Sequence, residues 1–321
     1  MKKQPIIAVV GPTASGKTAT GVLLAKMYNG EVVSADSMQI YKDMSISTAK
    51  PTAEEMQGIP HHLVGFAEHD KAFSVADYVM LAREVITEIS SRGKLPIIVG
   101  GTGLYVDSLL ENVKFDDTCS STEIRQKLYK EAEEFGNHAL WLRLNEIDPE
   151  TASNVHENNL SRVVRAIEVY EMTGEKLSEH KINSRAEESP FDVCYIGLTY
   201  DDRSILYDRI NKRVDKMLVE GLVEEAREFF NCEGHATSAQ AIGIKELFPY
   251  INGEDTLDNC IEKIKLETRH YAKRQLTWFR RNQNINWIAL DSIDLLNFNE
   301  QMANILKTII ANSNVLCYNK N

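Results

Sequence analysis

The chain has 321 residues, of which 43% are apolar and 26% charged, and its 36 basic against 47 acidic side chains give a formal net charge of −11. This is the composition of an ordinary soluble globular protein, and the acidic total argues against a surface that is basic throughout. The length allows one large domain or two smaller ones, because cores usually split beyond roughly 250 to 300 residues.

The first apolar run, Ile6–Val10, is shorter than the hydrophobic part of a secretory signal and far shorter than the ~20 residues that span a membrane. We therefore expect a cytoplasmic protein without a membrane anchor. The five cysteines are scattered, with no Cys-x-x-Cys pair and no histidines at metal-ligand spacing. This pattern is typical of a reduced compartment and argues against a structural zinc site.

The same run is continuous and apolar, which predicts a buried parallel strand. The loop after it, Gly11–Thr18 (GPTASGKT), matches the pattern G-x-x-x-x-G-K-[ST] and opens a predicted helix that stops at Asn29-Gly30. In such a loop the backbone N–H groups surround a phosphate, the lysine reaches terminal phosphate oxygens and the hydroxyl suits Mg²⁺. The motif predicts a diphosphate or triphosphate ligand without saying which molecule carries it.

A second strand is predicted over Glu31–Ala35, and Asp36 follows it directly. Enzymes that transfer phosphoryl groups usually hold Mg²⁺ with a carboxylate at the end of another strand. Here the third apolar run, Leu95–Val99, ends in Gly-Gly-Thr-Gly without a carboxylate. Asp36 is therefore open to three interpretations: a metal ligand, a general base, or the N-cap of a following helix.

Residues Ser74–Ser91 show the spacing of an amphipathic helix, which completes alternating strands and helices within the first hundred residues. This alternation predicts a parallel sheet with ligands at the carboxyl ends of its strands. For His61-His62 we expect a structural role, because adjacent side chains point in different directions and cannot share one ligand.

Beyond about Ser120 the chain is charged and helical up to about Glu188, which predicts an insertion. Further elements are a strand over Val193–Leu198, a long helical pattern over Ser204–Phe230 that contains Gly221, a helix over Ile261–Arg281 and a strand over Asn286–Leu290. We expect a P-loop α/β fold, a parallel sheet flanked by helices, with an all-helical insertion. The predicted boundaries are 1–118 and 189–313 for the discontinuous core, 119–188 for the insertion and 314–321 for a loose tail.

One stretch reverses the acidic balance, since Lys263–Arg281 holds seven cations and one anion. Aromatic residues interleave these charges, which favours a nucleic acid contact over a merely solvated helix face. For Trp278 and Phe279 themselves we favour packing over base stacking.

Several segments, in order from residue 6 to about 285, carry a family resemblance. They are GPTASGKT, DSMQIY (36–41), GGTGLY (100–105), RVVRAIEVYEMTG (162–174), RINKRVDKMLVEGLVEEA (209–226), AIGIKE (241–246) and TRHYAKRQLTWFRR (268–281). Together they resemble the bacterial tRNA dimethylallyltransferases. The resemblance implies transfer of a dimethylallyl group from its diphosphate to N6 of adenosine 37 in tRNA.

The resemblance also implies roles for individual residues. The phosphate loop would hold the diphosphate through Gly11, Thr13, Ala14, Ser15, Gly16, Lys17 and Thr18, with Mg²⁺ as cofactor on Thr18. Lys17, Thr102 and Arg209 would surround the leaving diphosphate, and Asp36 would accept the N6 proton. Arg213, one helical turn after Arg209, is the less favoured diphosphate ligand of the two.

The expected partner is the anticodon stem-loop of tRNA, which a monomer would bind. Its contacts would be Asp36, Ser37, Met38, Gln39, Thr102, Arg125, Ser161, Arg162, Arg165, Lys273 and Arg280. Gln39 is the favoured base reader, because an amide both donates and accepts at a base edge. Other interpretations stay open: core packing for Met38, solvent exposure for Arg125, and pairing with Glu168 for the two arginines Arg162 and Arg165.

The chain departs from the family pattern at two places. Asn158-Asn159-Leu160-Ser161 stands where the family usually has Asn-Asp-Pro-Gln, and Ile244 stands where an aromatic residue is common. One alternative function is an adenylate isopentenyltransferase with free AMP, ADP or ATP as acceptor. Another, from a different class, is a P-loop kinase or nucleotide-binding module, which would hydrolyse ATP or transfer its phosphate.

Overall fold

A computed structural model describes residues 3–115, 121–230, 238, 241–313 and 315. Its contacts divide the chain into two compact units, one of residues 1–110 with 190–321 and one of residues 111–189. The sequence placed these boundaries after residues 118 and 188. Of the expected tail 314–321, all but Val315 lies outside the described residues, and Val315 is buried in a hydrophobic cluster.

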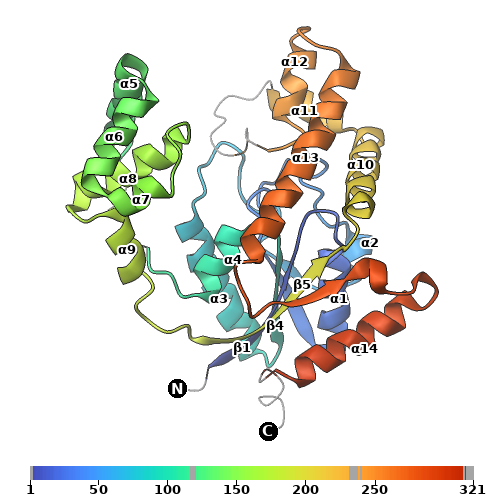
Figure 1. The fold of residues 1–321 in the computed structure, drawn as a ribbon. Coiled ribbons are helices and arrows are strands. Elements are labelled where there is room, and N and C mark those ends of the chain that lie inside the picture. The colour runs from blue at the N-terminus through green and yellow to red at the C-terminus, as the bar shows by residue number, and fades with distance from the viewer. Residues whose placement is uncertain (1–2, 116–120, 231–237, 239–240, 314, 316–321) are drawn as a thin grey trace. The chain divides into compact units, whose positions relative to one another are not determined.

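The larger unit is built on a six-stranded parallel sheet in the order β3-β2-β4-β1-β5-β6 (Figure 1). The strands are β1 (Gln4–Val10), β2 (Gly30–Ser34), β3 (His61–His62), β4 (Leu95–Gly100), β5 (Phe191–Thr199) and β6 (Asn286–Ala289). This confirms the predicted α/β fold class, and only the two-residue strand β3 was not predicted.

Helices cover both faces of this sheet. The helices of this unit are α1 (Lys17–Tyr28), α2 (Ala53–Met56), α3 (Val75–Ser91), α4 (Gly103–Leu110), α10 (Arg203–Val219), α11 (Leu222–Phe230), α12 (Phe248–Ile251), α13 (Leu257–Phe279) and α14 (Phe298–Ala311), of which α11 and α12 pack away from the sheet in a cluster of their own. Short 3₁₀ turns stand at Lys245–Leu247, Leu290–Ser292 and Leu295–Asn297. None of the helices among the described residues combines the length and apolarity needed to cross a membrane.

The sheet is buried from both sides, which explains why its strands read as continuous apolar runs. Along β1, Ile6 and Val10 pack into the cluster with α3 and α4, whereas Ile7 and Val9 pack into the cluster with α1 and α14. All four side chains are fully buried. Each contributes roughly 1.5 to 3 kcal/mol relative to exposure, so this central strand anchors the loop that follows it.

The long helical pattern over Ser204–Phe230 forms two helices instead of one, because the chain breaks at Gly221. This glycine has a φ of 104°, which the helical backbone does not allow and which other residues rarely adopt. The break lets α11 pack its own face, through Leu222, Ala226 and Phe229, into a third cluster. Ile244, one of the two departures from the family pattern, is fully buried in that cluster.

His61 and His62 have the structural role that their adjacency predicted. The His62 ring nitrogen Nε2 lies 2.7 Å from the buried Glu31 carboxylate, which also binds Arg92 at 2.7 Å and Lys94 at 2.6 Å. Burial alone would raise the pKa of Glu31, but the bonds to Lys94 and His62 and the charge of Arg92 hold it below its ordinary value. The cluster ties β3 to β2 and to the turn before β4.

The smaller unit is helical, as predicted for the insertion. It contains α5 (Thr122–Phe135), α6 (Asn137–Ile147), α7 (Pro149–Ser153), α8 (Leu160–Thr173) and α9 (Leu177–Asn183). It has its own core, in which Leu128, Leu140, Leu144, Val163 and Ile167 are buried. Asn159, within the departure from the family pattern, is the N-cap of α8 and makes no side-chain capping bond; its Oδ1 accepts from the Ser161 hydroxyl at 3.3 Å.

Candidate active site

The phosphate loop turns sharply between β1 and α1. Its backbone is left-handed at Ala14 and Gly16, with φ of 62° and 82°, and Gly11 has a φ of 147°. A Cβ at Gly11 would lie 2.6 Å from the Leu198 carbonyl oxygen of the neighbouring strand β5. Glycine is therefore required at this entry, and the loop can pass close to the ends of the strands.

Side-chain hydrogen bonds hold the loop from inside and from outside. The Ser15 hydroxyl and the Lys17 ammonium both donate to the Pro12 carbonyl, at 2.8 and 2.6 Å. From α13, Gln275 accepts from the Thr13 backbone N–H at 2.8 Å and donates to the Gly101 carbonyl at 2.9 Å. Gln275 thus joins the phosphate loop to the Gly-rich turn after β4.

Lys17 stands in a strongly perturbed environment. Burial and the nearby Arg213 cation lower its pKa to about 7, while the Asp36 charge opposes them. Burial also lowers the pKa of Arg213, again against the opposing charge of Asp36. Two desolvated cations beside one carboxylate form a site that a multiply charged anion would stabilise.

Arg209 lies at the same loop, since its Nε donates to the Ala14 carbonyl at 3.0 Å. It precedes Arg213 by one turn of α10, so this helix presents two guanidiniums on the phosphate-loop side. The structure therefore brings together Lys17 and both arginines, with Arg209 exposed and Arg213 partly buried.

No helix follows Asp36, and its side chain instead caps a turn. Its Oδ1 accepts from the backbone N–H groups of Met38 at 2.9 Å and Gln39 at 3.3 Å. Its Oδ2 has no hydrogen bond from the described residues. The N-cap interpretation is thus wrong in its helical form, and one carboxylate oxygen stays available to accept a proton.

Thr102 is close to Asp36, although 66 residues separate them in the sequence. Its Oγ1 accepts from the Ser37 N–H at 3.0 Å, and its own N–H donates to the Ala35 carbonyl at 3.2 Å. A Cβ on Gly100 would lie 2.1 Å from the Ala35 carbonyl oxygen, so glycine permits this close approach of the two strand ends.

Gln39, the favoured base reader, makes its side-chain hydrogen bonds within the protein. Its Nε2 donates to the Thr48 and Ala49 carbonyls at 3.2 and 3.1 Å, and its Oε1 accepts from Ser34 at 3.4 Å. These bonds join the amide to partly buried backbone carbonyls, and direct reading of a base by Gln39 stays a prediction. Met38 packs partly buried against the third hydrophobic cluster, as its packing interpretation predicted.

In the helical unit, the arginines expected to contact RNA fall into two groups. Arg125 and Arg165 bind the two oxygens of Glu168, at 2.8 and 2.7 Å, and Glu168 is fully buried. Ser161 and Arg162 are exposed at the start of α8. Arg165 pairs with Glu168 as its alternative interpretation stated, so both Arg125 and Arg165 hold a buried charge in addition to any RNA contact.

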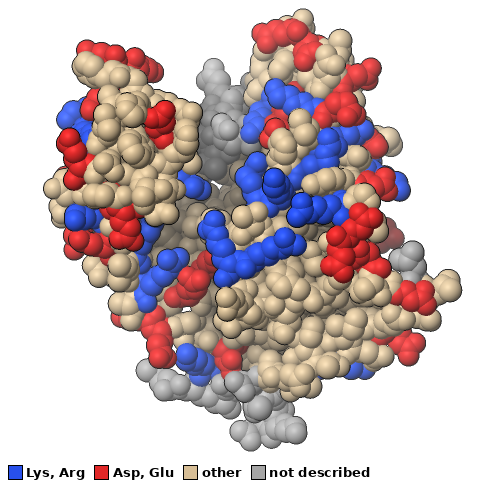
Figure 2. Space-filling view, viewed as in Figure 1, with Lys and Arg blue, Asp and Glu red and all other residues tan. Residues whose placement is uncertain are grey.

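The basic stretch of the sequence forms an exposed face of α13. Figure 2 shows blue side chains gathered over α13 and α10, and Lys273 and Arg280 are exposed on α13. The aromatic residues pack, as favoured: Phe279 is buried and the Trp278 indole donates to Asp107 at 2.6 Å. A Cβ at Gly103 would lie 2.2 Å from the Trp278 ring, so Trp278 fixes the start of α4.

Sequence reasoning missed Gln275, although the sequence carries a signal for it. Gln275 follows Ala272 by three residues and precedes Phe279 by four, and all three are buried on one face of α13. A polar residue on the apolar face of an amphipathic helix needs buried partners.

A resident metal cluster is absent from the described residues, since no three His, Cys, Asp or Glu side chains converge there. The Thr18 hydroxyl instead borders a small cavity of about 20 Å³ together with Ser34 and Gln39. Mg²⁺ is often bound by few protein groups plus the phosphates of its ligand. The residues fit a metal that arrives with an anionic ligand better than a metal held by the protein alone.

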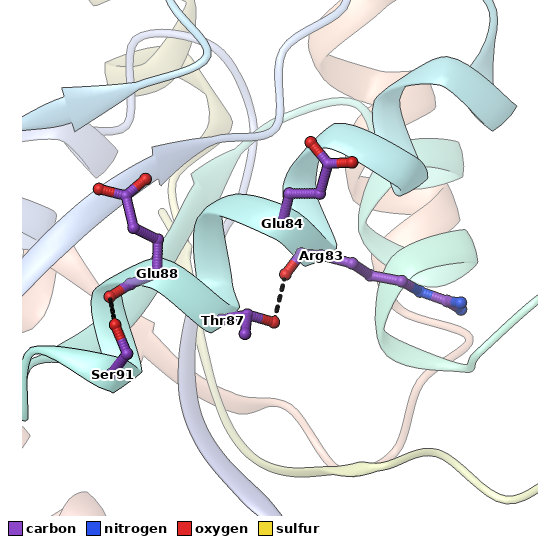
Figure 3. A pocket seen from close by; sticks show the side chains of 5 residues that line it. All are labelled: Arg83, Glu84, Thr87, Glu88 and Ser91. Carbon is purple, nitrogen blue, oxygen red and sulfur yellow. Dashed lines mark hydrogen bonds between the residues drawn. The ribbon is translucent and has the colours of Figure 1, made fainter.

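A larger surface hollow, of about 500 Å³, is not a candidate for the site. Arg83, Glu84, Thr87, Glu88 and Ser91, which line it, all belong to α3 (Figure 3). The hydroxyls of Thr87 and Ser91 donate back to carbonyls of their own helix. No polar groups from different elements converge there, as a binding site requires.

Comparisons with known proteins agree with this geometry. The family model described as IPP transferase matches residues 39–282. Proteins named tRNA dimethylallyltransferase are 48% identical over 94% of this chain in Caldanaerobacter subterraneus and 49% identical over 90% in Acetivibrio thermocellus, covering 96% and 93% of those relatives.

Two solved structures are similar over nearly the whole chain. The tRNA isopentenylpyrophosphate transferase of Bacillus halodurans superposes with a TM-score of 0.71 at 43% identity, covering 96% of this chain and 97% of that one. A eukaryotic dimethylallyltransferase acting on tRNA superposes with a TM-score of 0.79 at 30% identity, covering 97% and 80%.

Proposed function

Because this chain belongs to the IPP transferase family, we propose that it transfers a dimethylallyl group from dimethylallyl diphosphate to N6 of adenosine 37 in tRNA, releasing diphosphate. The observation that carries the proposal is that two sites of opposite charge lie at the carboxyl ends of β1 and β2, the two strands that flank β4. The phosphate loop with Lys17, Arg209 and Arg213 suits an anionic leaving group, and Asp36 beside it suits a proton acceptor.

The donor side of the reaction depends on electrostatics. An exocyclic adenine amine is a poor nucleophile, so the allylic carbon–oxygen bond must weaken as the amine approaches. The negative charge that grows on the diphosphate is then stabilised by the loop amides, by Lys17 and by the two guanidiniums of α10. Mg²⁺ bound through Thr18 would add positive charge to the same oxygens.

The acceptor side depends on Asp36. The attacking N6 loses a proton as its bond to carbon forms, and a positioned carboxylate takes this proton. Bonds from Met38 and Gln39 hold Oδ1, so Oδ2 is the oxygen that remains for the proton. The adenine must leave the base stack to reach this point, and the partly buried Ser37 and Thr102 beside Asp36 are the residues that we assign to the flipped nucleotide.

The affinity for diphosphate should depend on a proton taken up by Lys17. Its pKa of about 7 in the free protein rises when an anion binds, so binding at pH 8 takes up close to one proton and binding at pH 6 takes up little. Calorimetry of inorganic diphosphate binding at pH 8, in two buffers of different ionisation enthalpy, measures this uptake. In Lys17→Arg, whose side chain stays charged, the extra uptake should vanish; equal uptake in both proteins would assign it elsewhere.

Arg162 should bind an RNA phosphate through charge alone. Replacing it with alanine should weaken stem-loop binding several-fold and lower the slope of log K against log salt by about 0.7 to 0.9, the contribution of one phosphate. Arg162→Lys, which keeps the charge, should keep the slope. We choose Arg162 alone because replacing Arg165 also removes a partner of the buried Glu168. An unchanged slope in Arg162→Ala would place this side chain outside the RNA contact.

The proposal is tested by transfer from radiolabelled dimethylallyl diphosphate, offering an unmodified anticodon stem-loop and AMP in separate reactions, each with and without Mg²⁺. Label in the stem-loop, dependent on Mg²⁺, is the expected result. Label in AMP alone would identify an adenylate isopentenyltransferase. Label in neither, together with hydrolysis of ATP, would mean that the phosphate loop serves a kinase or nucleotide-binding module.

A further inference from the structure

Gln39 connects the candidate site to a short turn, and the proposed mechanism gives this turn no role. The turn covers Ser45–Ala49, and it closes through the Ala49 N–H, which donates to the Ile46 carbonyl at 2.9 Å. Like the end of any helical turn, it leaves amide groups at its start and carbonyl groups at its end without partners inside the turn. In this protein two side chains from elsewhere satisfy both ends.

Glu225 of α11 satisfies the start of the turn. Its Oε2 accepts from the N–H groups of Ser45 and Ile46, both at 2.8 Å, and its Oε1 accepts from Ser47 at 2.9 Å. A carboxylate that accepts three backbone N–H groups makes charge-assisted bonds, which are about twice as strong as neutral ones. Glu225 therefore fixes the turn to α11, across 178 to 180 residues of sequence.

Gln39 satisfies the other end, through the bonds of its Nε2 to the Thr48 and Ala49 carbonyls. The backbone N–H of the same residue donates to Asp36 Oδ1. The turn thus lies between Glu225 on one side and the Asp36–Gln39 segment on the other. Hydrogen bonds, linked by the backbone of the turn and by Gln39 itself, thus connect a carboxylate on α11 to the proposed base.

We infer that Glu225 is a positioning residue for the acceptor half of the reaction, acting through the Ser45–Ala49 turn and Gln39 on the Asp36–Gln39 segment. The inference rests on the proposed function. It assigns Gln39 to holding this segment in place instead of reading a base directly. It also gives α11 a part in positioning the acceptor half of the site, through Glu225.

Glu225→Gln tests this inference with little change in volume. The amide has one acceptor oxygen in place of two, and its NH₂ group would face a backbone N–H donor. We expect kcat/KM for the stem-loop to fall about 10- to 100-fold, the scale for losing charge-assisted bonds, with the affinity for diphosphate within twofold of wild type. Glu224→Gln, the exposed neighbour on the same helix, is the matched control and should behave as wild type.

A double-mutant cycle separates positioning from a direct role of Gln39. Gln39→Met removes the amide but keeps the length of the side chain. If both residues act through the same turn, Glu225→Gln should have little further effect once Gln39 is replaced, so the combined loss falls well below the product of the single losses. Losses that multiply would show independent roles and overturn the inference.

Hydrogen exchange supplies a readout that needs no activity. In Glu225→Gln, the amides of residues 45–47 should exchange faster, and so should those of residues 37–39, while Glu224→Gln leaves both unchanged. Faster exchange at 45–47 alone, with wild-type transfer, would overturn the inference. A wild-type enzyme that labels no stem-loop would instead overturn the proposed function, and exchange at residues 37–39 would still decide whether Glu225 holds this segment.

Discussion

Replacing Asp36 with asparagine should slow dimethylallyl transfer about 100-fold or more and leave the binding of both substrates largely intact. The loss is the scale of removing a positioned general base. The variant should preserve the turn, because the asparagine side-chain oxygen can still accept from the Met38 and Gln39 N–H groups, as Oδ1 does in the native protein. Only the oxygen that would receive the proton is exchanged for an NH₂ group.

Single-turnover transfer with preformed enzyme–substrate complex measures this effect apart from binding. Asp43→Asn is the control, because Asp43 is an exposed carboxylate a few residues away that lies 3.3 Å from the His69 ring nitrogen Nδ1. Asp43→Asn should transfer at the wild-type rate. Undiminished transfer by Asp36→Asn would remove this carboxylate from the proton transfer and leave it as a support of the turn.

The local parts of this fold could be predicted because each depends on a short stretch of sequence. Strands buried on both faces read as apolar runs, as Ile6–Val10 and Leu95–Val99 show. The phosphate loop is a contiguous motif whose backbone angles depend on its own glycines. The sequence shows a glycine at position 221 but does not predict that the helix ends there, because glycine inside a helical pattern is often tolerated.

The polar contacts that shape the site could not be predicted, because their partners lie far apart in the sequence. The Thr13 N–H and the Gln275 side chain are separated by 262 residues, and Glu225 reaches the 45–47 amides from a different helix. Gln39 shows the limit most clearly. Its amide suits a base edge by its chemistry, and the sequence does not reveal the bonds that this amide makes to the Thr48 and Ala49 carbonyls, 9 and 10 residues away.

Replacing Lys17 with methionine should reduce the rate of transfer by about 100- to 1,000-fold at saturating dimethylallyl diphosphate, the range for losing one group that stabilises transition-state charge. The methionine keeps an unbranched apolar stem, so the desolvated space around the side chain stays filled. The substitution removes only the ammonium group. Burial and the Arg213 charge hold the pKa of this group near 7 in the free protein.

The control for Lys17→Met is Lys26→Met on the same helix, where the ammonium is exposed and binds Gln57 on the surface. It should transfer at the wild-type rate. The rate at saturation decides the role of Lys17, because a group that binds donor and transition state equally raises KM and leaves kcat unchanged. A Lys17→Met enzyme with normal kcat and raised KM would show that Lys17 only binds the donor. The loop amides and the guanidiniums of α10 would then be the groups that stabilise the charge on the leaving diphosphate.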